Sequence, residues 1–220
     1  MKKEREPLNW IRPPGPVAAG LKIGLLGGSF NPAHEGHLYI SDIAMKKLGL
    51  DYVWWLVSPQ NPLKPSIGMA PLSDRLAYAA ARFEHNRRIF VVDLERDLGT
   101  RYTIDTIAKL KRRFAQVQFV WLMGSDNLDA FRHWKRWQDI LRSVPVAVVM
   151  RPGSTLSPLR AKPAQALSAK RCESALLRRR GRLETPCLTV LDGPRNSLSS
   201  TQIRGKPGWA ELFVGINPAC

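Results

Sequence analysis

Short apolar segments alternate with helical patterns along most of the chain, and this alternation constrains the fold more than any other feature. The apolar segments are rich in Val, Ile, Leu and Trp and are bounded by turn residues, as buried strands are. Strands alternating with helices predict right-handed βαβ units and one parallel sheet with helices on both faces. The fold class is therefore α/β, a Rossmann-like doubly wound parallel sheet. Strands are predicted over 22–26, 52–58, 89–93, 117–123, 144–150 and 188–191, and helices over 36–48, 72–84, 103–113, 128–141 and from Ser200.

The length of 220 residues suits one domain with additions rather than two full domains. Residues 1–20 mix charges and prolines without apolar periodicity, which predicts a flexible leader before a single domain over 21–220. Between 151 and 186 there are nine basic and two acidic residues, and we interpret this segment as a basic helical insertion on the surface.

A formal net charge of +16 predicts attraction to anions such as phosphates, nucleic acid or acidic membranes. Part of this charge lies within 151–186, so it does not locate a site. The apolar runs are too short to cross a bilayer and the basic, proline-rich start does not predict a secretory signal, so no membrane partner is expected. Cys172, Cys187 and Cys220 form neither a disulfide framework nor a C-x-x-C pair, which favours a reducing, cytoplasmic location.

A glycine-rich turn with two histidines follows the first predicted strand. Gly27 and Gly28 let the backbone approach a ligand, and the amides that open the next helix can bind an anion. His34 and His37 are three residues apart, which places them on one helix face where both can donate hydrogen bonds to one polyphosphate. A lone histidine here would more often be structural. The spacing fits neither a P-loop nor the H-E-x-x-H pattern of zinc peptidases, and no metal ligands are predicted.

A second candidate phosphate site lies near the end of the chain. Ser199, Ser200 and Thr201 open a predicted helix, and Arg204 follows about one turn later. Helix capping would explain one hydroxyl group. Three hydroxyl groups, together with the N–H groups of the first helical turn and an arginine, favour phosphate binding.

Both segments resemble motifs of the nucleotidylyltransferase superfamily. GSFNPAHEGH at 28–37 is similar to its G-x-F-[DN]-P-x-H-x-G-H signature, and LSSTQIR at 198–204 is similar to its I-S-S-T-x-I-R motif. The resemblance implies that the two histidines contact ATP phosphates and stabilise the transition state, and that the second motif holds the β- and γ-phosphates. The residues that it implies for ATP binding are Gly28, Ser29, Phe30, His34, His37, Asp126, Ser199, Ser200, Thr201 and Arg204.

Three further segments bear on the second substrate. Taken alone, Thr103 could cap a helix, Asp126 could cap a helix or bind a ribose, and Trp134 could be core or a stacking surface. NPLK at 61–64, YTIDT at 102–106 and GSDNL at 124–128 with the later tryptophan resemble bacterial nicotinate-nucleotide adenylyltransferases, a likeness that spans 21–204. It implies that Thr103 and neighbouring amides receive the pyridine carboxylate, that Trp134 stacks on the pyridine ring and that Lys64 lies near phosphate. The residues that it implies for nicotinate mononucleotide are Asn31, Lys64, Tyr102, Thr103 and Trp134.

The implied reaction transfers the adenylyl group of ATP to nicotinate mononucleotide, giving nicotinate adenine dinucleotide and pyrophosphate in NAD biosynthesis. The implied catalytic residues are His34, His37, Lys64 and Arg204, with Mg²⁺ carried by the substrate. A related transferase using nicotinamide mononucleotide or phosphopantetheine is the nearest alternative. A nucleic-acid-binding module, suggested by the net charge and the arginines at 178–180, is a more distant one. A homo-oligomer is compatible with this sequence.

Overall fold

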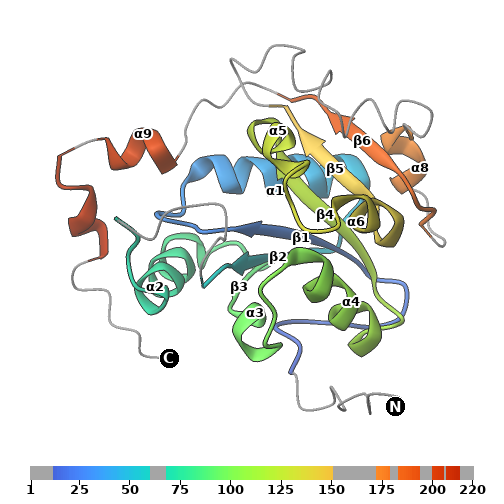
Figure 1. Cartoon of the computed structure of the whole chain (residues 1–220), viewed down its shortest axis with the longest axis horizontal. Helices are drawn as coiled ribbons and strands as arrows, with labels where there is room; N and C mark the ends of the chain where they lie inside the picture. The colour runs from blue at the N-terminus through green and yellow to red at the C-terminus, as the bar shows by residue number, and fades with distance from the viewer. Residues whose placement is uncertain are drawn as a thin grey trace.

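A six-stranded parallel sheet forms the centre of the computed structural model, which describes residues 12–59, 68–150, 172–178, 183–193, 200–205 and 207–213. The strand order is β3-β2-β1-β4-β5-β6. Every neighbouring pair runs parallel. The predicted doubly wound α/β class is confirmed (Figure 1). The strands are β1 (Lys22–Gly28), β2 (Tyr52–Val57), β3 (Ile89–Val92), β4 (Gln118–Gly124), β5 (Val146–Val149) and β6 (Leu188–Leu191).

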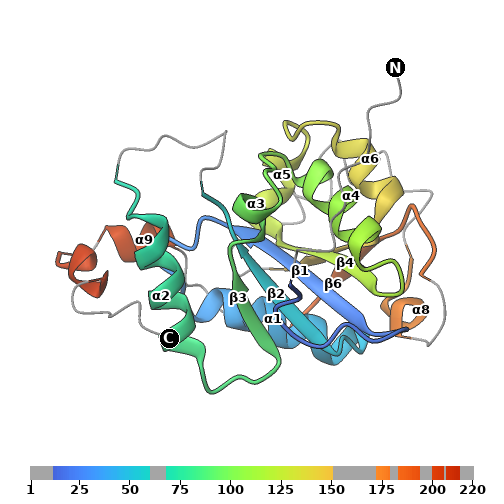
Figure 2. The ribbon, with the colours of Figure 1, turned by 90° about the horizontal axis from the view of Figure 1, so that it is seen from below.

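Helices cover both faces of the sheet (Figure 2). One face carries α1 (Glu35–Leu48), α2 (Leu72–Phe83) and α8 (Ser174–Arg178), and the other carries α3 (Leu94–Asp97), α4 (Thr103–Arg113), α5 (Leu128–Phe131) and α6 (Trp137–Ser143). A short 3₁₀ turn η1 (Ser125–Asn127) follows β4, and α9 (Ser200–Arg204) and η4 (Trp209–Phe213) come last.

The sheet separates two hydrophobic cores. Adjacent residues of a strand point to opposite faces. Trp54 therefore packs in the core under α4, whereas Trp55 packs in the core under α1, and both are fully buried. This burial on both faces explains why the strands are continuously apolar rather than alternating.

The predicted helix over 128–141 is wrong as a single element. Arg136 adopts a left-handed backbone (φ 52°) and separates α5 from α6. A residue in that conformation cannot continue a right-handed helix. The apolar spacing across this segment remains helical and contains neither glycine nor proline, so the sequence gives no sign of the break. The other predicted elements agree with the structure to within two residues, and the four-residue helix α3 is additional.

Two segments outside the predicted domain core contact it. Val17 packs against the core under α4, and the Gly20 amide donates a hydrogen bond to the Gln116 carbonyl, so packing extends N-terminal to residue 21. Residues 1–11 of the predicted leader lie outside the described residues. Within the predicted insertion, α8 packs against α1 and buries Leu177, whose carbonyl accepts a hydrogen bond from Lys22 Nζ.

The expectation that the cysteines are unpaired is wrong for two of them. Cys172 and Cys187 form a disulfide, with their Cα atoms 5.6 Å apart. Their separation of 15 residues matches no short motif, so only the fold brings them together. This pairing removes the cysteine argument for a reducing compartment. In the described part of the chain, no helix combines the length and apolarity needed to cross a membrane.

The close approach of β1 and β4 predicts a different cost for alanine at two adjacent glycines. A Cβ atom on Gly27 would lie 2.6 Å from the buried Trp121 ring, whereas one on Gly28 would come no closer than 3.4 Å to the Phe30 ring. We expect Gly27→Ala to lower the free energy of unfolding by about 2 kcal/mol through overpacking. Gly28→Ala is the matched control and should cost far less. Urea unfolding of both variants measures the difference, and equal losses would contradict this account.

Candidate active site

The predicted site lies at the carboxyl edge of the sheet, between β1 and β4. The chain proceeds outward from β1 to β2 and β3 on one side, and through β4 to β5 and β6 on the other. In such sheets, ligands bind where the strand order reverses. The histidine turn follows β1 and η1 follows β4, so both candidate segments open onto this position.

The two histidines form the start of α1. His34 is the N-cap, and its Nδ1 accepts a hydrogen bond from the Gly36 amide at 3.0 Å. His37 Nδ1 in turn accepts one from the His34 amide at 3.2 Å, which completes a reciprocal capping box. Because each Nδ1 is an acceptor, the proton of each neutral ring lies on Nε2. Each imidazole is therefore an N–H donor through Nε2.

Aromatic packing fixes the two imidazole rings. Their centroids are 4.0 Å apart, and the Phe30 ring lies 4.5 Å from His37 and 5.1 Å from Trp55. Phe30 is buried and adopts a left-handed backbone (φ 47°), an unusual conformation for a bulky residue. Strained residues persist where their surroundings hold them, often at functional sites. The buried Phe30 ring and its aromatic neighbours thus hold the histidine turn in one conformation.

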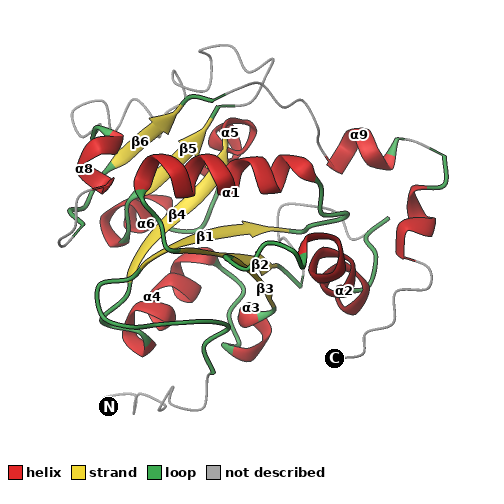
Figure 3. Cartoon of the chain, turned by 180° about the vertical axis from the view of Figure 1, so that it is seen from behind, coloured by secondary structure: helices red, strands yellow, loops and turns green. Residues whose placement is uncertain are grey.

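A hydrogen bond joins the two candidate ATP motifs. Arg204 Nη1 donates to the Asn31 carbonyl at 2.7 Å across 173 residues of sequence. Figures 1 and 3 both place α9 beyond the N-terminal end of α1, at the carboxyl edge of the sheet. Folding therefore brings the last motif against the first.

Not every predicted ATP residue falls within the described structure. Lys64 and Ser199 lie outside it, and for Ser200 and Thr201 it describes the backbone at the start of α9. Asp126 lies in η1 and is exposed.

The start of the histidine turn is mostly enclosed. Gly28 ends β1 and is half-buried, and Ser29 is buried. The side chain of Asn31 is also buried, and it donates to the Gly68 carbonyl and accepts from the Ala70 amide. Asn31 therefore ties the turn to the segment before α2, and its contact with a pyridine nucleotide stays a prediction.

Two of the predicted acceptor residues, Tyr102 and Thr103, lie at the start of α4. Tyr102 occupies the N-cap position and no side chain caps the helix, so Thr103 does not act as a cap. Lys135 lies 4.1 Å above the Tyr102 ring and 3.9 Å from an Asp105 carboxylate oxygen. Trp134 is half-buried and packs its edge against neighbouring aromatic rings of the core. The break between α5 and α6 thus brings Lys135, the neighbour of Trp134, beside the YTIDT segment.

Sequence reasoning missed two residues at this edge. Lys135 follows the predicted tryptophan, but its approach to Tyr102 depends on the helix break. Arg75 is buried, with 1% of its surface exposed, and donates hydrogen bonds to four backbone carbonyls. Its sequence signal is an arginine within the apolar stripe of the helix over 72–84, a position that a hydrophobic residue normally takes.

A buried carboxyl group lies behind the site. Burial raises the pKa of Glu95 from 4.5 to about 7, and a hydrogen bond from Ser58 only partly offsets this effect. Burial likewise raises the pKa of Asp93, although Arg96 lies 2.8 Å from its carboxylate. Both acids follow β3, at the same edge as the histidine turn.

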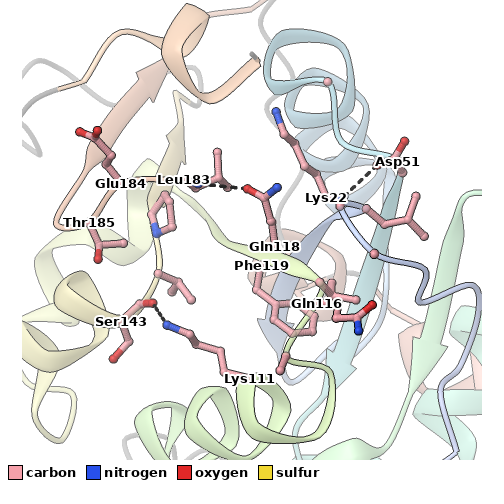
Figure 4. A pocket seen from close by; sticks show the side chains of 18 of the residues that line it. Lys22, Asp51, Lys111, Gln116, Gln118, Phe119, Ser143, Leu183, Glu184 and Thr185 are labelled. Atoms are coloured by element: carbon pink, nitrogen blue, oxygen red, sulfur yellow. Dashed lines mark hydrogen bonds between the residues drawn. The ribbon is translucent and has the colours of Figure 1, made fainter. Parts of the chain in front are cut away.

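A groove of about 1250 Å³ lies at the opposite edge of the sheet (Figure 4). It is lined by the starts of strands, where the Lys22 amide donates to Asp51 and the Leu183 amide donates to Gln118. Because the histidines follow the carboxyl end of β1, this groove is not the predicted site.

Comparison with known proteins identifies the family. The cytidylyltransferase-like family matches residues 25–206. A protein of Parvibaculum lavamentivorans, named "Probable nicotinate-nucleotide adenylyltransferase", is 52% identical over 197 residues, which cover 88% of this chain and 96% of the relative. A Cereibacter sphaeroides protein of the same name is 50% identical over 192 residues, covering 85% and 98%. The chain belongs to the nicotinate-nucleotide adenylyltransferase family.

Solved structures agree with the adenylyltransferase fold. Plasmodium falciparum nicotinic acid mononucleotide adenylyltransferase complexed with NaAD has a TM-score of 0.61, with 16% identity over 84% of this chain and 83% of that one. The same enzyme complexed with APC has a TM-score of 0.60. Because the sequence identity is so low, the likeness shows only that the two proteins share the arrangement of sheet and helices.

Proposed function

We propose that this chain transfers the adenylyl group of ATP to nicotinate mononucleotide, producing nicotinate adenine dinucleotide and pyrophosphate. The observation that carries the proposal is the hydrogen bond from Arg204 to the Asn31 carbonyl. It puts the guanidinium-bearing helix against the histidine turn, so that one triphosphate can contact both. The names of the relatives agree with this reaction.

The chemistry is an in-line displacement. A phosphate oxygen of nicotinate mononucleotide forms a bond to the α-phosphorus of ATP, and the bond from that phosphorus to the bridging oxygen breaks. The electron pair leaves with pyrophosphate. The acceptor phosphate is mostly dianionic near pH 7, because its second pKa is about 6. The reaction therefore needs no general base, and positioning with charge stabilisation suffices.

The histidine turn supplies fixed hydrogen-bond donors for this charge. The capping hydrogen bonds of His34 and His37 hold their rings and leave the proton on Nε2. Donors that are already oriented stabilise developing charge without reorganising during the reaction. Arg204 and the amides at the start of α9 would bind the β- and γ-phosphates, and Lys64 would act near the transferred phosphate.

The start of α4 suits the pyridine carboxylate. Its N-terminus lacks a side-chain cap, and helix N-terminal amides favour an anion. Lys135 adds a positive charge beside Tyr102. The half-buried Trp134 would offer its ring as a stacking surface.

Mg²⁺ would enter as the magnesium complex of ATP. Within the described ranges, no cluster of three His, Cys, Asp or Glu residues has metal-binding geometry. Phosphate oxygens and water suit Mg²⁺ as its main ligands. The ion would neutralise phosphate charge, and the described residues would contact the nucleotide rather than enclose the metal.

Pyrophosphate release tests the proposal directly. Purified protein with MgATP should release pyrophosphate with nicotinate mononucleotide at least ~10-fold faster than with nicotinamide mononucleotide or phosphopantetheine, because the α4 amides favour a carboxylate. A preference for another acceptor would contradict the proposed substrate. Strong salt-dependent binding to duplex DNA without turnover would instead favour the nucleic-acid alternative. The elution volume of the purified protein in size-exclusion chromatography gives its oligomeric state. We also propose a cytoplasmic location, which requires the enzyme to be active under reducing conditions.

A further inference from the structure

Arg75 is a buried cation that holds the loops around the candidate active site. Its Nε donates to the Ala70 carbonyl at 2.9 Å, and Nη1 donates to the carbonyls of Ser29 and Ser58. Nη2 donates to the Pro59 carbonyl at 3.1 Å. Four of the five N–H groups of the guanidinium are therefore matched to backbone acceptors.

The four carbonyls belong to three different segments. Ser29 opens the histidine turn after β1, Ser58 and Pro59 follow β2, and Ala70 precedes α2. These segments are far apart along the chain, and one planar guanidinium fixes all of them. The Asn31 side chain adds a second connection, because it bonds both Gly68 and Ala70.

Asp93 contributes negative charge near Arg75, although its carboxylate pairs with Arg96. Its side chain is 7% exposed at the end of β3, and its charge raises the pKa of Arg75, against the larger lowering caused by burial. A cation buried this deeply is costly unless it is paired and hydrogen-bonded. A leucine in the stripe of α2 would bury no charge, but it would leave these four carbonyls without their donor.

The structure assigns Arg75 the role of a positioning residue for adenylyl transfer, which sets the histidine turn against the loop after β2. This role rests on the proposed function. Arg75 bonds backbone rather than substrate, so its loss should misplace the phosphate donors. Displacement of catalytic groups by about 1 Å can cost ~100-fold in rate.

Arg75→Lys tests the assignment because lysine keeps the charge but loses the planar fork. We expect kcat to fall ~30-fold, while KM for both nucleotides stays within about threefold, in protein shown to be folded by circular dichroism. Arg87→Lys, at an exposed arginine shortly after the same helix, is the control and should leave kcat unchanged. A folded Arg75→Lys with normal kcat, or with KM rather than kcat altered, would overturn the role.

Two additional measurements keep the test decisive. If Arg75→Lys does not fold, Asn31→Ala removes the parallel connection to Gly68 and Ala70 and should lower kcat while KM for nicotinate mononucleotide stays within about threefold. A normal kcat, with or without a raised KM, would refute the assignment. Hydrogen exchange is independent of the reaction. Peptides covering 28–34 and 68–72 should exchange faster in Arg75→Lys than in Arg87→Lys, even if the acceptor proves to be another nucleotide. Unchanged exchange would likewise overturn the inference.

Discussion

His37→Ala should lower kcat by about 10²- to 10³-fold, the loss seen when one fixed donor to a developing oxyanion is removed. The His37 ring lies 4.0 Å from that of His34, and its Nδ1 is held by the His34 amide. Alanine removes the Nε2 donor and one half of the capping box. Loss of the capping acceptor should lower the free energy of unfolding by only about 1 kcal/mol. Steady-state pyrophosphate release, together with urea unfolding, separates the two effects.

His85→Ala is the matched control, because His85 is exposed after α2 and away from the histidine turn. It should change neither kcat nor the free energy of unfolding by a measurable amount. A folded His37→Ala protein that turns over normally would remove this imidazole from the mechanism. A variant with unchanged kcat but much higher KM would make His37 a binding residue only.

Glu95→Gln should change how stability depends on pH. The pKa of Glu95 is raised by burial from 4.5 to about 7, so the folded protein holds this proton more tightly than the unfolded chain does. Stability therefore falls as pH rises from about 4.5 to 7 and levels off above that. A pKa difference of one corresponds to about 1.4 kcal/mol, so Glu95 destabilises the fold by up to ~3 kcal/mol above pH 7.

The measurement is the difference in free energy of unfolding between the variant and the parent protein. Between pH 4.5 and 8 this difference should shift by up to ~3 kcal/mol in favour of Glu95→Gln. Asp93, whose pKa is also raised by burial, contributes in the same direction and remains in both proteins. A pH-independent difference for Glu95→Gln would show that Glu95 is ionised without cost.

The fold could be predicted from local patterns because each strand is a short apolar run and most helices show helical apolar spacing. The apolar strands, the turn after β1 and the spacing of His34 and His37 are local features. That the two ATP motifs meet was implied by the resemblance, but the hydrogen bond from Arg204 to the Asn31 carbonyl was not predicted, since no local rule connects residues 173 positions apart.

Local sequence patterns could not reveal residues whose role depends on tertiary packing. Lys135 reaches Tyr102 because Arg136 interrupts a segment whose apolar spacing is helical throughout. Cys172 and Cys187 meet through the packing of α8 beside β6. Arg75 was detectable as an anomaly, but its four carbonyl partners come from loops that the fold assembles.

The contact between Arg204 and Asn31 also bears on shortened forms of the protein. All six strands of the sheet lie before residue 192, because β6 ends at Leu191. A chain cut between β6 and α9 therefore keeps every strand but loses the arginine that meets the first turn. Such fragments should be ordered but inactive.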